Sequence, residues 1–392
     1  MTAFALTGEQ QDFAERVRQI AADQLRPLAE AGTPGRVNRP LIKAMGDLGL
    51  LARLFPGIGD GSPLSREAAA LDLCLLREAL ARQSTEAETA LALQGLGSYP
   101  VLQSGQEEVV RRWLPAVAAG DAVAAFALTE PEAGSDAAAL TLRAEPDGRE
   151  WRLTGEKIWI SNAPEADFYT VFARTTPGAG ARGVSAFVVP ADRPGLGGEH
   201  LDMISPHPIG RLTFDGVPVM ATELLGEADR GFRVAMRTLD LFRPSVGAFA
   251  VGMAQAALDA AVAHAGSRTA FGGPLKDQQA VSHLLAEMAT RTEAARLLVY
   301  AAAAGYDAAG GGAGASGGAG GGKGLAGRSA MAKLFATETA QFVVDAAVQV
   351  HGARALRRGH LLEHLYREVR APRIYEGASE VQRTIIAREL YR

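Results

Sequence analysis

The chain holds 392 residues, of which 47% are hydrophobic and 21% charged, and its formal net charge at pH 7 is -4. This composition is typical of a folded globular protein with two or three domains, and it excludes an intrinsically disordered chain. The small negative charge provides no overall attraction to nucleic acid or to an anionic membrane, so we expect neither as a partner.

The first residues predict a cytoplasmic protein. Residues 1–25 include acidic side chains and lack the long apolar run of a signal peptide, and nowhere do about 18 uncharged apolar residues follow one another. The single cysteine, Cys74, cannot form an internal disulfide. Its leucine neighbours predict a buried and unreactive thiol.

Residues 1–121 are expected to form an all-α domain. Thr7 precedes an acidic, helix-forming segment and is a plausible N-cap, and helical spacing continues over residues 41–54 and 66–81.

Residues 122–231 have a different pattern, which predicts β structure. Short runs rich in valine, isoleucine, threonine and aromatic residues are bounded by glycine, proline, aspartate or asparagine. They cover residues 151–153, 157–161, 169–173, 184–189 and 212–214. We expect an antiparallel sheet here.

Residues 232–392 return to helical spacing and predict a helix bundle. Val281, Leu284, Leu285 and Met288 stand at positions i, i+3, i+4 and i+7, and a similar pattern covers residues 330–350. Residues 309–324 are so rich in glycine that they predict a flexible loop between two helices. Because the strands are grouped between helical regions, the fold class is α+β and not a doubly wound nucleotide-binding sheet.

One string could suggest a metal site. His360, Glu363 and His364 match the inverted zinc-peptidase pattern, which places two imidazoles one helical turn apart. No third ligand motif accompanies them, and neighbouring arginines disfavour a cation, so the prediction is a solvated helix face without metal. A phosphate-binding P-loop and a nucleophile elbow are also absent from the sequence.

Five longer segments carry a family resemblance. They are AAFALTEPEAGSD at 124–136, LTGEKIWISN at 153–162, RTAFGGPLKDQQ at 268–279, QVHG at 349–352 and REVRAPRIYEGASEVQ at 367–382. In this order they closely resemble the acyl-CoA dehydrogenase family, and weaker agreement, for example around Asp240, extends over nearly the whole chain.

The resemblance implies an N-terminal helical domain, a middle antiparallel β domain and a C-terminal four-helix bundle, which agrees with the periodicity. It implies an FAD-dependent oxidoreductase of fatty acid metabolism that acts on CH–CH groups and converts an acyl-CoA to the trans-2-enoyl-CoA. It also implies an electron-transferring flavoprotein as partner and a homotetramer built as a dimer of dimers.

By the same resemblance, one set of residues binds FAD. Leu128 and Thr129 lie against the isoalloxazine edge, Trp159 packs on the ring, and Ser161, where the family more often has threonine, bonds near N5. Arg268 matches an arginine that binds the pyrophosphate, for which a permanently charged planar fork is suited. The remaining cofactor residues are Phe271, Gln279, Gln349 and Gly352. Ala353 stands where the family often has a second glycine.

Substrate contacts are carried over in the same way. Ser135, Asp240 and Arg243 match residues that contact the CoA portion, although an i, i+3 ion pair is also a simple explanation for the last two. Tyr375 and Gly377 flank the candidate base, and Ala378 replaces the usual threonine.

The catalytic prediction rests on Glu376. Removing an α proton from a thioester needs a base with a raised pKa, and burial against the flavin and acyl chain would raise the pKa of a glutamate. The resemblance adds the Glu376 N–H and a flavin ribityl hydroxyl as contacts to the enolate oxygen, while a hydride passes to flavin N5. A branch of the family carries its base at the position of Phe242, which cannot serve.

Two alternatives remain open at this point. One keeps the same site but acts on an acyl carrier protein thioester or lets reduced flavin react with oxygen. The other is a non-catalytic, flavin-bearing partner subunit of a hetero-oligomer, which would be expected to lose the base. The presence of both Arg243 and Glu376 favours the CoA dehydrogenase. The sequence does not define the acyl chain, although Ala90, Ala92 and Gly95 suggest room in the pocket.

Overall fold

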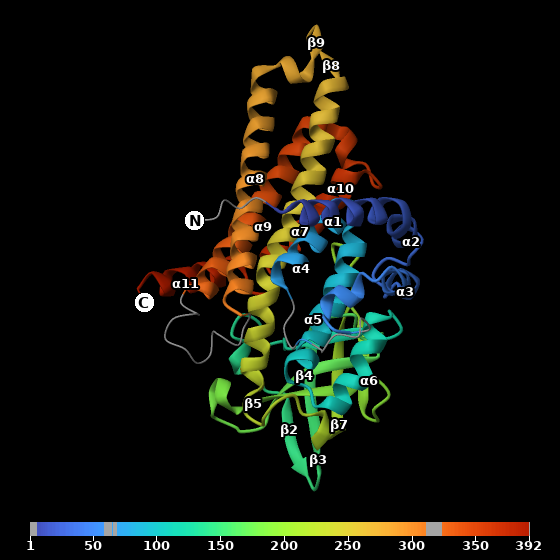
Figure 1. The fold of residues 1–392 in the computed structure, drawn as a ribbon, viewed down its shortest axis with the longest axis vertical. Coiled ribbons are helices and arrows are strands. Elements are labelled where there is room, and N and C mark those ends of the chain that lie inside the picture. The colour runs from blue at the N-terminus through green and yellow to red at the C-terminus, as the bar shows by residue number, and fades with distance from the viewer. Residues whose placement is uncertain (1–5, 59–64, 66–68, 311–323, 392) are drawn as a thin grey trace. The chain divides into compact units, whose positions relative to one another are not determined.

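The structure, a computed structural model, describes residues 6–58, 65, 69–310 and 324–391, so the predicted glycine-rich loop lies almost entirely outside the described residues. Helices precede and follow the β region, which confirms the predicted α+β fold (Figure 1). By its internal contacts the chain forms two compact units. The helical unit comprises Met1–Arg26, Ala69–Glu88 and Asp240–Arg392, and the sheet unit comprises Pro27–Ala68 and Thr89–Leu239.

The sheet unit is built on a seven-stranded sheet within the described residues. Its strands are β1 Ala124–Ala127, β2 Arg143–Asp147, β3 Glu150–Ser161, β4 Phe168–Arg174, β5 Val184–Pro190, β6 Leu196–His200 and β7 Ile209–Met220. They are ordered β1-β4-β2-β3-β7-β6, with β5 also paired to β4. β4 and β5 are almost entirely buried, so they form the core of this unit.

The sheet is not wholly antiparallel, which corrects one prediction. β1 pairs with β4 in parallel, from Ala124 opposite Phe168 to Ala127 opposite Val171, and one parallel bridge joins β2 to β4. The other strand pairs are antiparallel. Apolar patterning determines which face of a strand is buried, but it does not determine strand direction.

The predicted strand segments fall on β3, β4, β5 and β7. The segments at 151–153 and 157–161 are parts of one 12-residue strand, β3, because Gly155 and Glu156 between them pair with β7 and Thr154 pairs with β2. Two register shifts interrupt that pairing, between Leu153 and Gly155 and between Lys157 and Ile160. The second shift affects the candidate flavin residues.

Helices complete the sheet unit: α2 Arg26–Glu30, α3 Arg39–Asp47, α6 Glu107–Ala118 and most of α5 Thr85–Ser104. The predicted helix at 41–54 is wrong as a single element. α3 ends at Asp47, Gly49 adopts φ 70°, and a 3-10 turn follows at Leu51–Leu54. Glycine reaches this left-handed conformation at little cost, so it stops the helix there.

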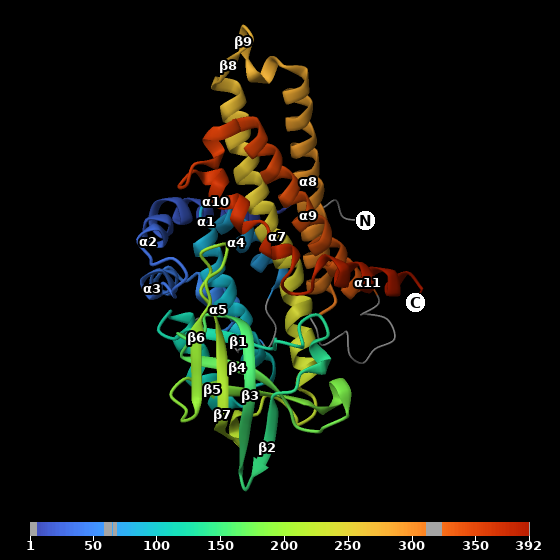
Figure 2. The same cartoon turned by 180° about the vertical axis from the view of Figure 1, so that it is seen from behind.

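The helical unit begins with α1 Gly8–Ile20, and Thr7 forms a capping box with Gln10, which confirms Thr7 as the N-cap. A π-helical turn at Ala21–Leu25 follows α1. The other helices are α4 Ala70–Ala81, α7 Gly231–Ser267 from Asp240 onward, α8 Gln279–Ala308, α9 Leu325–His351, α10 Leu361–Glu368 and α11 Ser379–Leu390. α9 packs against α8, α10 and α11, and the short β8–β9 hairpin (Thr269–Ala270, Gly273–Pro274) joins α7 to α8 (Figure 2).

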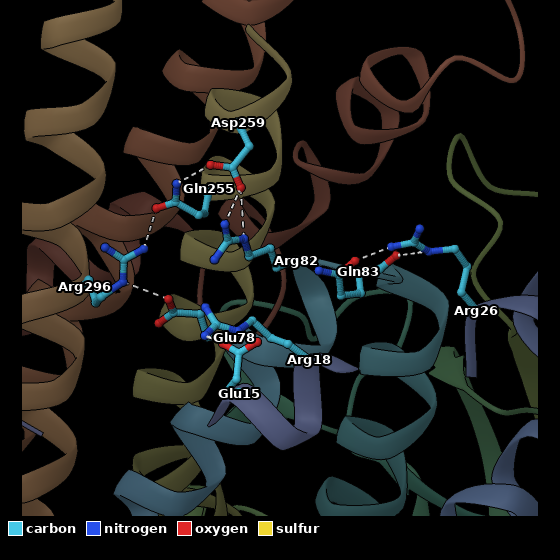
Figure 3. A network of polar contacts seen from close by, with 9 residues as sticks. All are labelled: Glu15, Arg18, Arg26, Glu78, Arg82, Gln83, Gln255, Asp259 and Arg296. Atoms are coloured by element: carbon cyan, nitrogen blue, oxygen red, sulfur yellow. Dashed lines mark hydrogen bonds and ion pairs between the residues drawn. The ribbon is translucent and has the colours of Figure 1, made fainter. Parts of the chain in front are cut away.

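A polar network holds α4 against its neighbours in the helical unit (Figure 3). Arg82 donates to Asp259 on α7 at 2.6 Å, and Arg296 on α8 donates to Glu78 at 2.8 Å. Gly252 allows close packing as well, because a Cβ there would lie 2.6 Å from the Glu78 carbonyl oxygen. α4 also carries Cys74, which is buried and free as predicted, and Arg77, which contributes to the site.

α7 is long and apolar enough to cross a membrane by length and composition. However, 72% of its most apolar window is buried inside the molecule. This burial is typical of a core helix in a soluble protein.

Candidate active site

The loop that carries Glu376 lies between a 3-10 turn, Ala371–Arg373, and α11. Glu376 adopts φ 52° and Gly377 φ 94°, both in the left-handed region. For a residue other than glycine this conformation costs about 1–3 kcal/mol, so the surrounding contacts must hold it in place. A Cβ at Gly377 would lie 2.5 Å from Nε2 of Gln382, so the end of that side chain would have to shift.

The carboxylate of Glu376 is poorly solvated and lacks a protein partner on one oxygen. Its Oε2 atom is buried without a hydrogen bond among the described residues. Burial raises the pKa of Glu376, and the positive charges of Arg77, Lys333 and Arg243 oppose this rise. A carboxylate with a raised pKa and a free oxygen is suited to accept a proton.

Two of the three nearby cations are neutralised by carboxylates of their own. Arg77 is 3% exposed, bonds to the equally buried Glu88, and donates to Ser245 Oγ at 2.6 Å. Arg243 Nη1 donates to Asp240 Oδ1 at 2.8 Å. The sequence did not single out Arg77 on α4 or Glu88 on α5, since a charged residue on a helix ordinarily indicates a solvated face.

Asp240 and Arg243 form the i, i+3 pair that the sequence suggested, but only Asp240 is partly exposed. The Arg243 side chain is only 8% exposed, and its Nε atom is buried without a partner. Burial raises the pKa of Asp240, and Arg243 opposes the rise. A water molecule or a ligand group can therefore bond to Arg243 Nε. Phe242, between them, is buried in the core.

Lys333 is the third cation and was also absent from the sequence predictions. Its side chain is fully buried on α9, and its Nζ donates to the Tyr375 carbonyl at 2.8 Å and the Gly377 carbonyl at 2.6 Å. The predicted substrate residues Tyr375 and Gly377 therefore flank Glu376 in a loop that is held through its backbone.

In the sheet unit, Leu128 and Thr129 follow β1 and are held by β3. Lys157 Nζ donates to the Leu128 carbonyl at 2.9 Å, and the Ile158 N–H donates to the Thr129 carbonyl at 3.0 Å. Lys157 is fully buried and forms an ion pair with Glu130 at 2.8 Å. This buried pair fixes the backbone of the segment that the resemblance places against the flavin.

Trp159 lies where β3 departs from regular pairing with β7, and Ser161 follows where the pairing resumes, opposite Ile209. Trp159 adopts φ 61° and is 51% exposed, which leaves its ring free as a packing surface. The Ser161 hydroxyl lies 2.8 Å from Nε2 of His207, a residue that the sequence did not suggest. Burial lowers the pKa of His207 to about 4, so this imidazole is neutral near pH 7. Ser135 is exposed in the turn before a 3-10 segment at Ala137–Ala139.

The other predicted cofactor residues lie in the helical unit and are exposed: Arg268, Phe271, Gln279, Gln349 and Gly352. Phe271, at the tip of the hairpin, is 93% exposed with φ 53°. The rings of His264 and His351 stack with centroids 4.2 Å apart, which joins the ends of α7 and α9 that carry these residues. Ala353 is exposed, and Ala378, at the N-cap of α11, provides no side-chain cap.

These groups have the chemistry that a flavin dinucleotide needs. Arg268 pairs with no carboxylate among the described residues, so its charge is available to a pyrophosphate. Thr129 and Ser161 offer hydroxyls, and Trp159 offers an open aromatic face. The donor set fits FAD.

The two histidines of the zinc-like string have other partners. His360 caps α10 by accepting the Leu362 N–H, and His364 Nε2 lies 2.6 Å from Thr85 Oγ1. Across the described part of the chain, no three histidine, cysteine or carboxylate side chains are placed to hold a metal ion.

The comparisons with known proteins agree with the fold. Models of the N-terminal, middle and C-terminal domains of acyl-CoA dehydrogenases match residues 7–121, 125–217 and 229–391. The chain is 34% identical over 391 residues to cyclohexane-1-carbonyl-CoA dehydrogenase of Geobacter metallireducens, which covers 99% of this chain and 98% of that protein.

Two solved structures extend the comparison. A glutaryl-coenzyme A dehydrogenase in complex with glutaryl-CoA has a TM-score of 0.90 at 31% identity, covering 100% of this chain and 97% of the other. PigA with FAD and proline has a TM-score of 0.89 at 26% identity, covering 100% and 99%.

The fold and these matches define a flavoprotein oxidoreductase. The chain belongs to the acyl-CoA dehydrogenase family, whose domain models together span most of its length. The family accounts for the FAD-compatible residues, because a solved relative on this fold contains FAD.

Proposed function

We propose that this protein converts an acyl-CoA thioester to the trans-2-enoyl-CoA, with Glu376 as the base that removes the α proton. The observation that supports this most directly is the buried, unpartnered Oε2 of Glu376 beside three cations. An oxygen without a protein donor needs a partner from outside the chain, and an acidic C–H of a bound thioester provides one at the moment of transfer.

The electrostatics of the loop suit this transfer. The raised pKa of Glu376 lies closer to the pKa of the α C–H of the bound thioester, which favours the transfer of the proton. The protonated Glu376 that results is neutral and compatible with burial. The Glu376 N–H has no acceptor among the described residues, so it is free to donate to the thioester oxygen as negative charge develops there.

Leu128, Thr129, Trp159 and Ser161 would hold the isoalloxazine ring, and Arg268 the pyrophosphate. Phe271, Gln279, Gln349 and Gly352 would contact the rest of the dinucleotide. When bound, FAD supplies the acceptor for the hydrogen of the β carbon. Ser135, Asp240 and Arg243 would contact the CoA portion.

The proposal extends to partners and location. Arg268, Phe271 and Gln349 are exposed in the helical unit, which agrees with a homotetramer in which one subunit completes another's cofactor site. An electron-transferring flavoprotein would reoxidise the enzyme, and the cytoplasm would be its location. Light scattering after size-exclusion chromatography tests the tetramer, and reduction of an electron-transferring flavoprotein by enzyme and substrate tests the partner.

The test of the reaction is an anaerobic titration of the purified flavoprotein with a panel of acyl-CoA thioesters. We expect at least one thioester to bleach the flavin, Glu376→Gln to bind it without bleaching, and the exposed control Glu287→Gln on α8 to behave as wild type. Removing a general base typically costs a factor of about 10² to 10⁴ in rate.

A flavin that no acyl-CoA bleaches would contradict the proposal. In that case bleaching by an acyl carrier protein thioester would identify a carrier-bound substrate. Failure of both would favour a non-catalytic subunit, which co-purification with an active relative would test. Rapid reoxidation of substrate-reduced enzyme by air would favour oxygen as the acceptor.

A further inference from the structure

A buried lysine holds the loop of the candidate base from behind. Lys333 lies on α9 with no exposed surface, and its ammonium donates to two carbonyls, those of Tyr375 and Gly377, on either side of Glu376. Gln382 on α11 donates to the Glu376 carbonyl at 3.3 Å and to the Gly377 carbonyl at 2.8 Å. Three successive carbonyls are therefore bound by side chains of α9 and α11.

This arrangement determines where the opposite side of the peptide points. In a trans peptide the C=O and the N–H lie in one plane and point in opposite directions. The Tyr375 carbonyl shares its peptide plane with the Glu376 N–H, so the bond from Lys333 directs that N–H away from α9. Among the described residues this N–H has no acceptor. It is therefore held free for a ligand.

The charge of Lys333 is also unusual in this part of the helical unit. Arg77 is paired with Glu88 and Arg243 with Asp240, whereas Lys333 has no carboxylate within ion-pair distance in the described chain. Burying an ammonium costs several kcal/mol, and a methionine would fill the same space without that cost. The cost indicates a role that packing alone does not explain.

We propose that Lys333 is a positioning residue for proton transfer: it fixes the Tyr375–Glu376 peptide so that the Glu376 N–H faces the thioester oxygen, and it keeps positive charge beside the carboxylate. This inference rests on the proposed function of Glu376. Once the α proton has moved to Glu376, the negative charge lies on the substrate oxygen, and the unneutralised Lys333 remains to balance it.

The surroundings of Lys333 predict a dependence on pH. Burial lowers the pKa of Lys333 to about 8, while the charges of Glu376 on the loop, Glu338 on α9 and Glu380 on α11 oppose the decrease and Arg243 on α7 adds to it. The ammonium loses its charge and one donor as the pH rises through about 8. The turnover number kcat of the wild type should therefore fall above about pH 8.

The test compares two replacements of similar length. Lys333→Met removes both the charge and the donors, and Lys333→Gln keeps two N–H donors without the charge. We expect Lys333→Met to lower kcat by about 10² to 10³, as the loss of an oxyanion donor does, with FAD content and the dissociation constant of the acyl-CoA within a few-fold of wild type. Lys333→Gln should recover at least about tenfold in kcat and lack the decline above pH 8.

Lys43→Met, at an exposed lysine of the sheet unit, is the control and should keep the wild-type kcat and pH profile. Turnover of Lys333→Met within about threefold of wild type would overturn the inference, because the expected loss of kcat is about 10² to 10³. So would a loss of kcat that only follows the loss of bound FAD. If neither variant folds, the wild-type profile decides: a flat kcat between pH 7 and 9.5 overturns it.

The two proposals fail differently. If wild type is inactive on every thioester, the proposed function fails. If wild type is active and Glu376→Gln is not, but Lys333→Met retains turnover, only the inference about Lys333 fails.

Discussion

Replacing Lys157 tests whether the buried ion pair of the sheet unit holds the flavin-binding segment. Lys157 is fully buried and pairs with Glu130, which is 4% exposed. Lys157→Met leaves the Glu130 carboxylate without its cation and the Leu128 carbonyl without its donor. Breaking a buried pair by removing one partner costs about 3–5 kcal/mol, and we expect a destabilisation of this size.

The remaining contacts of Glu130 place the expected value within this range. Its carboxylate still accepts the N–H groups of Thr141 and Leu142 and the Thr141 hydroxyl. These donors keep the loss below that of an isolated buried charge. In Glu130→Gln combined with Lys157→Met, no charge is left buried, and the amide oxygen still accepts bonds at one of the two positions where Glu130 accepts N–H groups, although the amide NH2 at the other cannot. The double variant should recover at least about 2 kcal/mol relative to Lys157→Met.

Tryptophan fluorescence during urea unfolding measures this effect selectively. All three tryptophans, Trp113, Trp151 and Trp159, lie in the sheet unit. Release of FAD, followed by its visible absorbance, gives a second measurement, since the Leu128 carbonyl beside the proposed flavin site loses its donor. If the two single substitutions add within about 0.5 kcal/mol in the double variant, the residues act independently and the reasoning is refuted.

Three further predictions concern the candidate site. Glu376→Gln should raise the melting temperature at pH 7. The pKa of Glu376 is raised in the folded state, so the stability of the wild type falls as the pH rises above about 4.5, the pKa of an unfolded glutamate. Calorimetry should show no difference between the two proteins below that pH. Arg268→Gln should weaken FAD binding by about 10- to 100-fold, the loss of one charge-assisted bond, as measured by equilibrium fluorescence, and unchanged binding would show that Arg268 does not contact the pyrophosphate. Gly377→Ala should destabilise the fold by more than about 1 kcal/mol and lower kcat, since a φ of 94° is strained for a residue with a Cβ and Gln382 would have to shift from the carbonyls that it binds. Unfolding and turnover equal to wild type would contradict this.

Local patterns predicted the fold well because each depends on nearby residues. Thr7 is the N-cap of α1, and β4 and β5 coincide with their apolar runs. The joining of two segments into β3 and the parallel pairing of β1 with β4 were not predicted, because both depend on a partner strand that is remote in sequence.

The buried charges were missed for a related reason. Lysine and arginine on a helix ordinarily indicate a solvated face, and Lys333 and Arg77 are exceptions. A usable signal exists for Lys333: Ala336 and Ala340 continue its face at i+3 and i+7, and both are buried. A charged residue within such an apolar stripe predicts a buried ion or a backbone contact. His207 gave no such signal, because its partner Ser161 lies 46 residues earlier in the chain.

Several features that lower the stability of the helical unit lie in or beside the loop of Glu376. The left-handed φ of Glu376, its unpartnered Oε2 and the buried ammonium of Lys333 each lower the stability of the folded state, and Gln382 Oε1 nearby is also buried without a bond. If the loop served only the packing of the fold, each of these features could be replaced by a residue that makes the folded state more stable. Their retention together indicates that the loop is arranged for a bound molecule. It follows that acyl-CoA, by supplying the missing partners, should raise the melting temperature of wild type more than that of Glu376→Gln.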